Sequence, residues 1–110
     1  MDISFKTNKL AKQMHDDAAL KRHFGDRAKP LKLRLRVLAV APTLAAVPVT
    51  PPDRCHQMSG DRAGQVAVML TGNWRLIFEP NHDPVPCLPD GGLELAAVTA
   101  IRILEVVDYH

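Results

Sequence analysis

QVAVMLTGNWRLIFE, residues 65–79, contains two apolar runs separated by a single turn signal. The first run, residues 65–71, includes several β-branched side chains, and the second, residues 74–79, includes two aromatic ones. Runs of this kind favour β-strands, and the Gly72-Asn73 pair between them is typical of a hairpin turn. The segment therefore predicts two antiparallel strands joined by a tight connection.

Further strands are predicted on both sides of this hairpin. Residues 99–107 form another apolar, β-branched run, and residues 54–58 form a shorter candidate. Residues 3–6 alternate apolar and polar side chains, which predicts a short edge strand. Residues 80–92 hold four prolines and two glycines, so we expect a long surface excursion there. A turn of helix is expected to follow at residues 93–97.

Two helices are predicted ahead of the sheet. Thr7 or Asn8 is a good N-cap for a helix that extends to about Phe24, and Gly25 provides a stop signal. Residues 30–40 fit a strand, because leucines alternate with basic residues, but they also fit a helix with leucines one turn apart. We favour the helix, because prolines lie at its start and just beyond its end. Its basic side chains are then expected to spread around the exposed side: Lys32, Arg34 and Arg36.

Together these elements predict one α+β domain over residues 1–110. Its two N-terminal helices pack on a small, mainly antiparallel sheet of about four to five strands. The sequence has no apolar stretch of 18 residues and no basic-then-apolar leader, so we expect a cytoplasmic protein without membrane contact. The two cysteines lie far apart and are expected to be reduced. The five histidines form no short ligand pair, so we expect no metal and no cofactor.

The charge is unevenly distributed along the chain. Residues 1–64 carry 12 Lys and Arg against 6 Asp and Glu, whereas residues 65–110 carry 2 against 6. A basic first half suggests an anionic partner. The alternative is a basic helical face that is only solvated.

Several polar residues fall where the predicted sheet could bring them together. They are His56 before the hairpin, Arg62, Asn73 and Arg75 near it, and Asp108, Tyr109 and His110 after the last strand. Arginine binds phosphate oxygens bidentately, histidine titrates near neutrality, and tyrosine stacks on a base. Without a metal-ligand cluster, this set indicates acid–base chemistry on a phosphodiester.

Each of these residues also has a purely structural interpretation. His56 fits a hydrogen-bonded sheet histidine, and Arg75 fits a residue that pairs with Glu79 or covers Trp74. The last three residues fit a frayed end with chance polar side chains. Composition and spacing alone leave both interpretations open.

Three segments resemble one known family in the same order along nearly the whole chain. They are CHQMSGDRAG at residues 55–64, GNWRLIF at residues 72–78 and DYH at residues 108–110. They are similar to the HigB branch of the RelE/ParE toxin superfamily, the toxins of bacterial type II toxin–antitoxin pairs. The resemblance implies a RelE-like fold and a helix-turn-helix, HigA-like antitoxin as partner.

The same resemblance implies a ribosome-dependent mRNA endonuclease that cuts the A-site codon without metal. The ribose 2′-OH attacks the adjacent phosphate and leaves a cyclic phosphate and a 5′-OH. Carried over by position, the family's active-site histidine falls on His56 and its phosphate-binding arginine on Arg75, and its terminal acid, aromatic and histidine fall on Asp108, Tyr109 and His110. For these residues we expect His56 and His110 to divide the base and acid roles and Arg75 to stabilise the phosphate charge. Tyr109 stacks on a base, Asp108 orients an imidazole or touches a base edge, and Arg62 and Asn73 contact the RNA.

One departure from the family pattern bears on activity. Many relatives carry a lysine where this chain has Ser59, so a phosphate contact would be missing or supplied by another group. The candidates for that replacement are Lys32, Arg34 and Arg36. Two other functions remain as alternatives: a ParE-like toxin that binds DNA gyrase, and an attenuated toxin that acts mainly as antitoxin partner and co-repressor.

Overall fold

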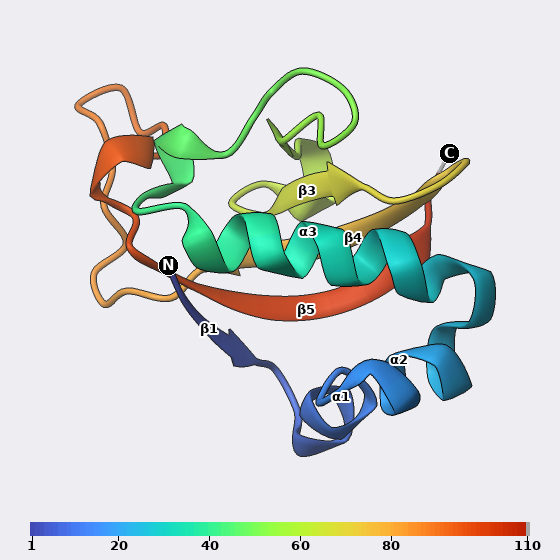
Figure 1. Ribbon diagram of the computed structural model, residues 1–110. Helices are drawn as coiled ribbons and strands as arrows, with labels where there is room; N and C mark the ends of the chain where they lie inside the picture. The colour runs from blue at the N-terminus through green and yellow to red at the C-terminus, as the bar shows by residue number, and fades with distance from the viewer. Residues whose placement is uncertain (110) are drawn as a thin grey trace.

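The computed structural model describes residues 1–109, and His110 lies outside the described residues. Figure 1 shows a sheet with one long helix lying across it and two short helices at its lower side. The elements in chain order are β1 (Asp2–Phe5), α1 (Asn8–Gln13), α2 (Asp17–Phe24), η1 (Gly25–Arg27), α3 (Ala28–Val40), η2 (Leu44–Ala46), β2 (His56–Gln57), η3 (Gly60–Arg62), β3 (Val66–Met69), β4 (Trp74–Pro80), η4 (Leu95–Ala97) and β5 (Ala100–Asp108), where η marks a 3₁₀ turn.

The five strands form one mixed sheet in the order β1-β5-β4-β3-β2. β2–β3, β3–β4 and β4–β5 are antiparallel, whereas β1 runs parallel to β5 at the opposite edge. The connection through Gly72 and Asn73 joins β3 to β4, as the sequence predicts. A bulge shifts the β4–β5 register between Ile77 and Phe78. The α+β class and a mainly antiparallel sheet of five strands are therefore confirmed.

The helical region differs from the prediction, because the first helix is broken in two. Thr7 caps α1 as expected, since its side chain accepts a hydrogen bond from the Leu10 amide. Asp16 then caps a separate helix, α2, by accepting from the Ala19 amide at 2.8 Å. A good N-cap residue in mid-segment favours a new helix start over continuation. Three helices, not two, therefore precede β2.

The third helix, α3, confirms the helical interpretation of residues 30–40 and covers one face of the sheet (Figure 1). Its Leu31 and Leu38 are fully buried and belong to the same core as Leu76 and Phe78 of β4. Burying apolar side chains of this size stabilises the fold by about 1.5–3 kcal/mol each. The face with Leu76 and Phe78 is therefore the interior face of the sheet.

The other face of the sheet carries a second, much smaller apolar cluster. Met58, Ala67 and Ile77 form it, and Ala67 and Ile77 are fully buried. Arg62, in the turn after β2, lies over this face, because its guanidinium contacts the Glu105 carboxylate at 3.2 Å. We call this surface the open face.

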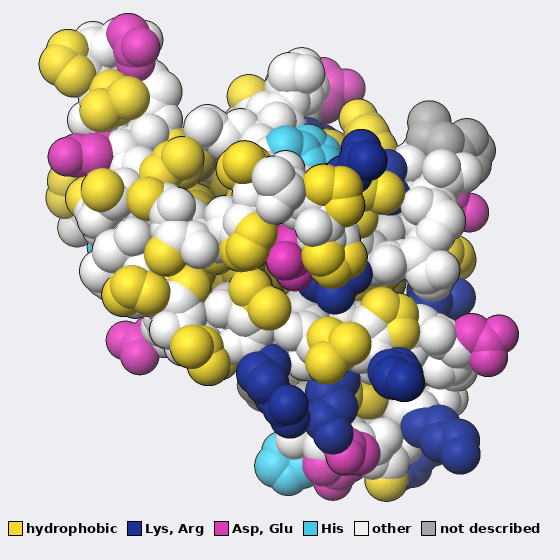
Figure 2. Space-filling model, turned by 45° about the horizontal axis from the view of Figure 1, so that its top comes forward, with side chains coloured by type: hydrophobic (Ala, Val, Ile, Leu, Met, Phe, Trp, Pro, Cys, Tyr) yellow, Lys and Arg dark blue, Asp and Glu magenta, His cyan; other side chains and the backbone are white. Residues whose placement is uncertain are grey.

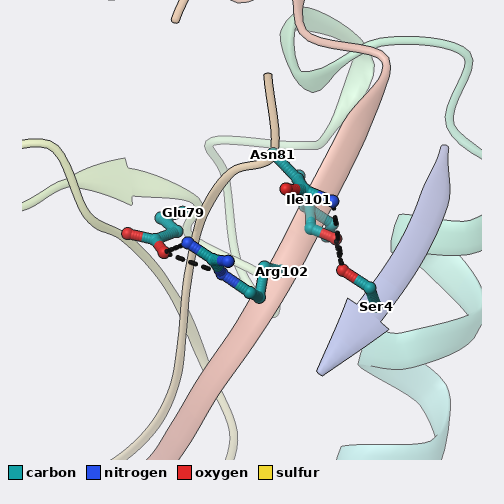
Figure 3. A network of polar contacts seen from close by, with 5 residues as sticks. All are labelled: Ser4, Glu79, Asn81, Ile101 and Arg102. Atoms are coloured by element: carbon teal, nitrogen blue, oxygen red, sulfur yellow. Dashed lines mark hydrogen bonds and ion pairs between the residues drawn. The ribbon is translucent and has the colours of Figure 1, made fainter. Parts of the chain in front are cut away.

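A polar network holds the end of the sheet that lies away from the β3–β4 turn (Figure 3). Arg102 of β5 donates to the Glu79 carboxylate of β4, with a distance of 2.9 Å from Nε. Asn81 donates to Ser4 of β1 at 3.2 Å, and Ser4 donates to the Ile101 carbonyl. These contacts join β1, β4 and β5.

Two negative findings hold for the described part of the chain. No helix in it is long and apolar enough to cross a membrane. No three or more of its His, Cys, Asp and Glu residues are grouped so that they could hold a metal ion.

Candidate functional site

Strand register brings His56 and Arg75 onto the open face. His56 of β2 lies opposite Ala67 of β3, and Arg75 of β4 lies opposite Met69 of β3. Directly opposed residues in antiparallel strands point to the same side, and residues two apart along a strand share a face. Since Leu76 points into the core, Arg75 points away from it. His56 and Arg75 are therefore on the same side of the sheet, from separate strands.

These two residues line one open pocket of about 500 Å³. Arg54, which precedes β2, lines it as well, so the lining residues include two arginines and a histidine. No carboxylate of residues 1–109 lines the pocket. In Figure 2 a histidine lies beside Lys and Arg side chains near the top of the molecule. The remaining lining residues are Val49, Thr50, Pro51, Cys55 and Met69.

Arg75 is held by the backbone and has no acidic partner among residues 1–109. Its Nη1 donates to the Gly72 and Trp74 carbonyls, both at 3.2 Å. The two structural interpretations of this residue are wrong, because Glu79 pairs with Arg102 and the Trp74 ring is covered by Arg27 at 3.7 Å. Nε and Nη2 of Arg75 have no hydrogen-bond partner within residues 1–109, so they can bind an anion.

His56 is exposed and makes one hydrogen bond within the described residues. Its Nδ1 lies 2.8 Å from the Arg54 carbonyl oxygen. Its Nε2 has no hydrogen-bond partner in residues 1–109. His56 is therefore a hydrogen-bonded histidine of the sheet, as its structural interpretation expects, and its exposed position also leaves it accessible for chemistry.

The chain end is anchored as far as Tyr109. The Tyr109 amide donates to the Asn73 carbonyl at 2.9 Å, and the Tyr109 ring lies 5.6 Å from the Arg62 guanidinium carbon. Asp108 pairs with Trp74 in the β4–β5 register, one position beyond the partner of Arg75. Strand alternation therefore places Asp108 on the Trp74 side and returns Tyr109 to the open face. The frayed-end interpretation is wrong for residues 108–109, and His110 lies outside the described residues.

The basic residues of α3 are not brought to this pocket. Arg34 is 7% exposed, its Nε donates to the Met69 carbonyl at 2.7 Å, and it pairs with buried Asp53 at 3.5 Å. The expectation that Arg34 is exposed is therefore wrong, because its position on α3 faces the sheet. Lys32 pairs with Asp17 at 2.7 Å, and Arg36 is exposed on the helix. Figure 2 shows most of the visible basic side chains gathered over the helical part.

Two features of the pocket have no counterpart in the sequence prediction. Arg54 lies two residues before His56, and no sequence pattern indicates it as a site residue. Cys55 is partly buried, and burial, with a smaller contribution from the Asp53 carboxylate, raises the pKa of its thiol to about 11. A thiol with such a pKa stays protonated and poorly nucleophilic near neutrality. Cys55 therefore lines the pocket but is not suited to act as a nucleophile there.

The structure thus brings His56, Arg75 and Arg54 to one pocket and Arg62, Asn73 and Tyr109 to the adjoining strand ends. An imidazole with a free nitrogen beside unpaired guanidinium groups can accept a proton and stabilise an anion. In comparisons with known proteins, no family model matches this sequence, and no curated protein matches it.

Proposed function

We propose that this protein is a toxin of the HigB type, a ribosome-dependent endonuclease that cleaves mRNA by metal-independent acid–base catalysis. The observation that supports it best is the pocket on the open face, which His56 and Arg75 both line and which no carboxylate of residues 1–109 lines. A pocket with this charge favours a phosphate group over a neutral or cationic ligand. The RelE-like character of the fold is part of the same proposal.

The proposed reaction needs three functions at one phosphodiester. A base removes the proton of the ribose 2′-OH, whose oxygen attacks phosphorus and displaces the 5′-oxygen of the next nucleotide. An acid protonates that leaving oxygen, so the products are a 2′,3′-cyclic phosphate and a 5′-OH. His56 and His110 divide the base and acid roles, and Arg75 stabilises the charge that develops on the phosphate oxygens.

The neighbouring residues are suited to hold a splayed nucleotide. Tyr109 is 43% exposed, and its ring offers a surface on which a base can stack. Arg62 lies near this ring, and the Asn73 carbonyl accepts from the Tyr109 amide. Both residues are proposed to contact the RNA backbone, while Asp108 orients an imidazole or touches a base edge. Lys32 and Arg36 lie on α3 and are proposed to contact the ribosomal RNA at a distance from the cut.

The proposal extends to the partner and the compartment. A HigA-like helix-turn-helix antitoxin would neutralise the toxin, and both would act in the cytoplasm. The net positive charge of residues 1–64 suits an anionic partner of either kind, RNA or an acidic protein segment.

The decisive experiment maps new 5′ ends on a translated message after induction, for the full chain and for a chain that ends at Val107. We expect cuts within A-site codons for the full chain and a large loss for the shortened one. Equal cleavage by the two chains would refute the proposed site. Trapped gyrase–DNA complexes without mRNA cleavage would instead support the ParE-like alternative, and normal growth without antitoxin would support the attenuated one.

A further inference from the structure

We infer that Arg54 is a missing member of this site, with two functions: its carbonyl fixes the tautomer of His56, and its guanidinium is a second anion-binding group beside Arg75. The inference rests on the proposed function for its substrate class, an RNA phosphodiester. Its geometry comes from the loop that precedes β2, from the contacts of that loop with α3 and β3, and from the pocket that Arg54 shares with Arg75.

The backbone at Arg54 has an unusual conformation that the surroundings enforce. Its φ of 45° makes it the single non-glycine residue with positive φ among residues 1–109. Strained backbone of this kind persists where neighbouring contacts fix it, often at functional sites. The Arg54 amide donates to the Thr50 carbonyl at 3.0 Å, and the Cys55 amide donates to the Pro48 carbonyl at 3.0 Å. These two hydrogen bonds fix the backbone on both sides of the Arg54 Cα.

The preceding residue ties the same loop to the interior. Asp53 is 6% exposed and pairs with Arg34 of α3 at 3.5 Å. Its carbonyl accepts a hydrogen bond from the Met69 amide of β3 at 2.8 Å. The Arg54 carbonyl is therefore held in place from α3 and from β3, and its direction toward His56 does not depend on the exposed side chain of Arg54.

This carbonyl determines which nitrogen of His56 carries the proton. A carbonyl oxygen only accepts, so the 2.8 Å contact requires a proton on Nδ1. In the neutral ring Nε2 is then an unprotonated acceptor. An imidazole in water prefers the opposite tautomer, with the proton on Nε2. Arg54 is thus a positioning residue that presents Nε2 of His56 as the base for the 2′-OH, which assigns the acid role to His110.

Arg54 is the second arginine of the pocket, beside Arg75. Arg54 and Arg75 both line this cavity, and no carboxylate of residues 1–109 lines it, since the nearby Asp53 pairs with Arg34. Two like charges at one cavity repel each other unless an anion lies between them. A phosphate group satisfies both guanidinium groups in the bidentate manner that arginine favours.

Three variants separate these two functions. Arg54→Gly keeps the carbonyl, because glycine adopts positive φ freely, but it removes the guanidinium. Arg54→Lys keeps a positive charge. Arg54→Val strongly disfavours positive φ and displaces the carbonyl. Arg22→Ala, which removes an exposed arginine from α2, is the matched control.

The first readout is the ¹⁵N spectrum of neutral His56, which reports the tautomer without any need for cleavage. We expect the proton on Nδ1 in the wild type, in Arg54→Gly and in Arg54→Lys, and a shift toward the Nε2 tautomer in Arg54→Val. A proton on Nε2 in the wild type would overturn the positioning role, even if Arg54→Val did not fold.

The second readout is binding of adenosine 3′-monophosphate, followed by NMR titration. We expect Arg54→Gly to weaken binding about tenfold, as for the loss of one charged hydrogen-bonding group, and Arg54→Lys to recover part of it. Arg22→Ala should bind as the wild type does. Unchanged affinity in Arg54→Gly would overturn the anion-binding role. Because neither readout uses a ribosome, a protein that fails to cleave mRNA but passes both tests refutes the proposed function and not the Arg54 assignment.

Discussion

The two ends of the β4–β5 ladder each carry an arginine, and the structure treats them differently. At the far end, Arg102 is neutralised by Glu79 within the network of Figure 3. At the hairpin end, Arg75 donates to two backbone carbonyls, forms no ion pair within residues 1–109, and lines an open pocket with Arg54. The two arginines lie on the same pair of strands, but a carboxylate compensates the charge of Arg102 and no described carboxylate compensates that of Arg75.

Arg102 therefore makes a stabilising contact, whereas Arg75 is suited to bind a ligand. An exposed ion pair such as Arg102–Glu79 contributes about 1 kcal/mol or less and cancels most of its own field. A guanidinium without a carboxylate partner keeps its field and its hydrogen-bond donors for a ligand. The comparison therefore places recognition of an anion at the hairpin end and a purely structural role at the far end.

The largest expected effect on mRNA cleavage comes from removing His56, the proposed base. His56→Ala should lower the rate of mRNA cleavage by about 10²–10⁴, the range for removal of a general acid or base. The measurement is the rate of 5′-end formation on a translated message. His23→Ala, which changes an exposed histidine on α2, is the control and should cleave as the wild type does. Similar rates for both variants would mean that the free Nε2 of His56 has no catalytic role.

The second effect concerns the buried pair that holds the loop at the hairpin end. Arg34→Ala leaves the Asp53 carboxylate buried and unpaired, so we expect a loss of about 3–5 kcal/mol in the free energy of unfolding. Arg102→Ala, at the far end, should cost about 1 kcal/mol or less. Urea denaturation of both variants compares the two pairs directly. Equal losses would show that burial does not distinguish them.

Sequence patterns predicted the strands well because those signals are local. The hairpin at Gly72-Asn73, the long last strand and the helix over residues 30–40 follow from turn chemistry and apolar spacing. The break before α2 also has a local signal, since Asp16 is a strong N-cap residue in mid-segment. The parallel pairing of β1 with β5 has none, because it joins the two ends of the chain.

The candidate site was predicted in part for the same reason. His56 and Arg75 were identified, and the burial of Arg34 could have been, because it lies at helical spacing between buried Leu31 and Leu38. Arg54 carries no local signal. Its positive φ depends on long-range ties, above all the burial of the preceding aspartate, and a non-glycine residue gives no indication of such a backbone.

A smaller effect concerns alkaline stability, to which the Cys55 thiol contributes. Burial raises its pKa from 9.0 to about 11 in the folded protein, so the unfolded chain loses this proton first as pH rises. The free energy of unfolding should therefore fall between pH 9 and about pH 11. We expect a shallower fall in Cys55→Ala and the wild-type fall in Cys87→Ala, measured by urea titration at each pH. A wild-type slope in Cys55→Ala would contradict this origin of the decline.

The smallest effect is expected from the contact that steadies the chain end. Arg62→Ala removes the guanidinium 5.6 Å from the Tyr109 ring and the pair with Glu105. Partly exposed cation–π contacts contribute about 0.5–1 kcal/mol, so stability should change little. Amide exchange at Tyr109, whose hydrogen bond to Asn73 holds the tail, should nevertheless become faster. Unchanged exchange would show that the tail is held without Arg62.

The two arginines of the β4–β5 ladder differ in function because they differ in partners: Arg102 pairs with Glu79, whereas Arg75 lines the open pocket. The most direct test compares mRNA cleavage by Arg75→Ala and Arg102→Ala at equal levels of folded protein. We expect cleavage to be lost in Arg75→Ala and retained in Arg102→Ala. Retained cleavage in Arg75→Ala, or equal loss in both variants, would contradict the assignment of the reaction to the hairpin end.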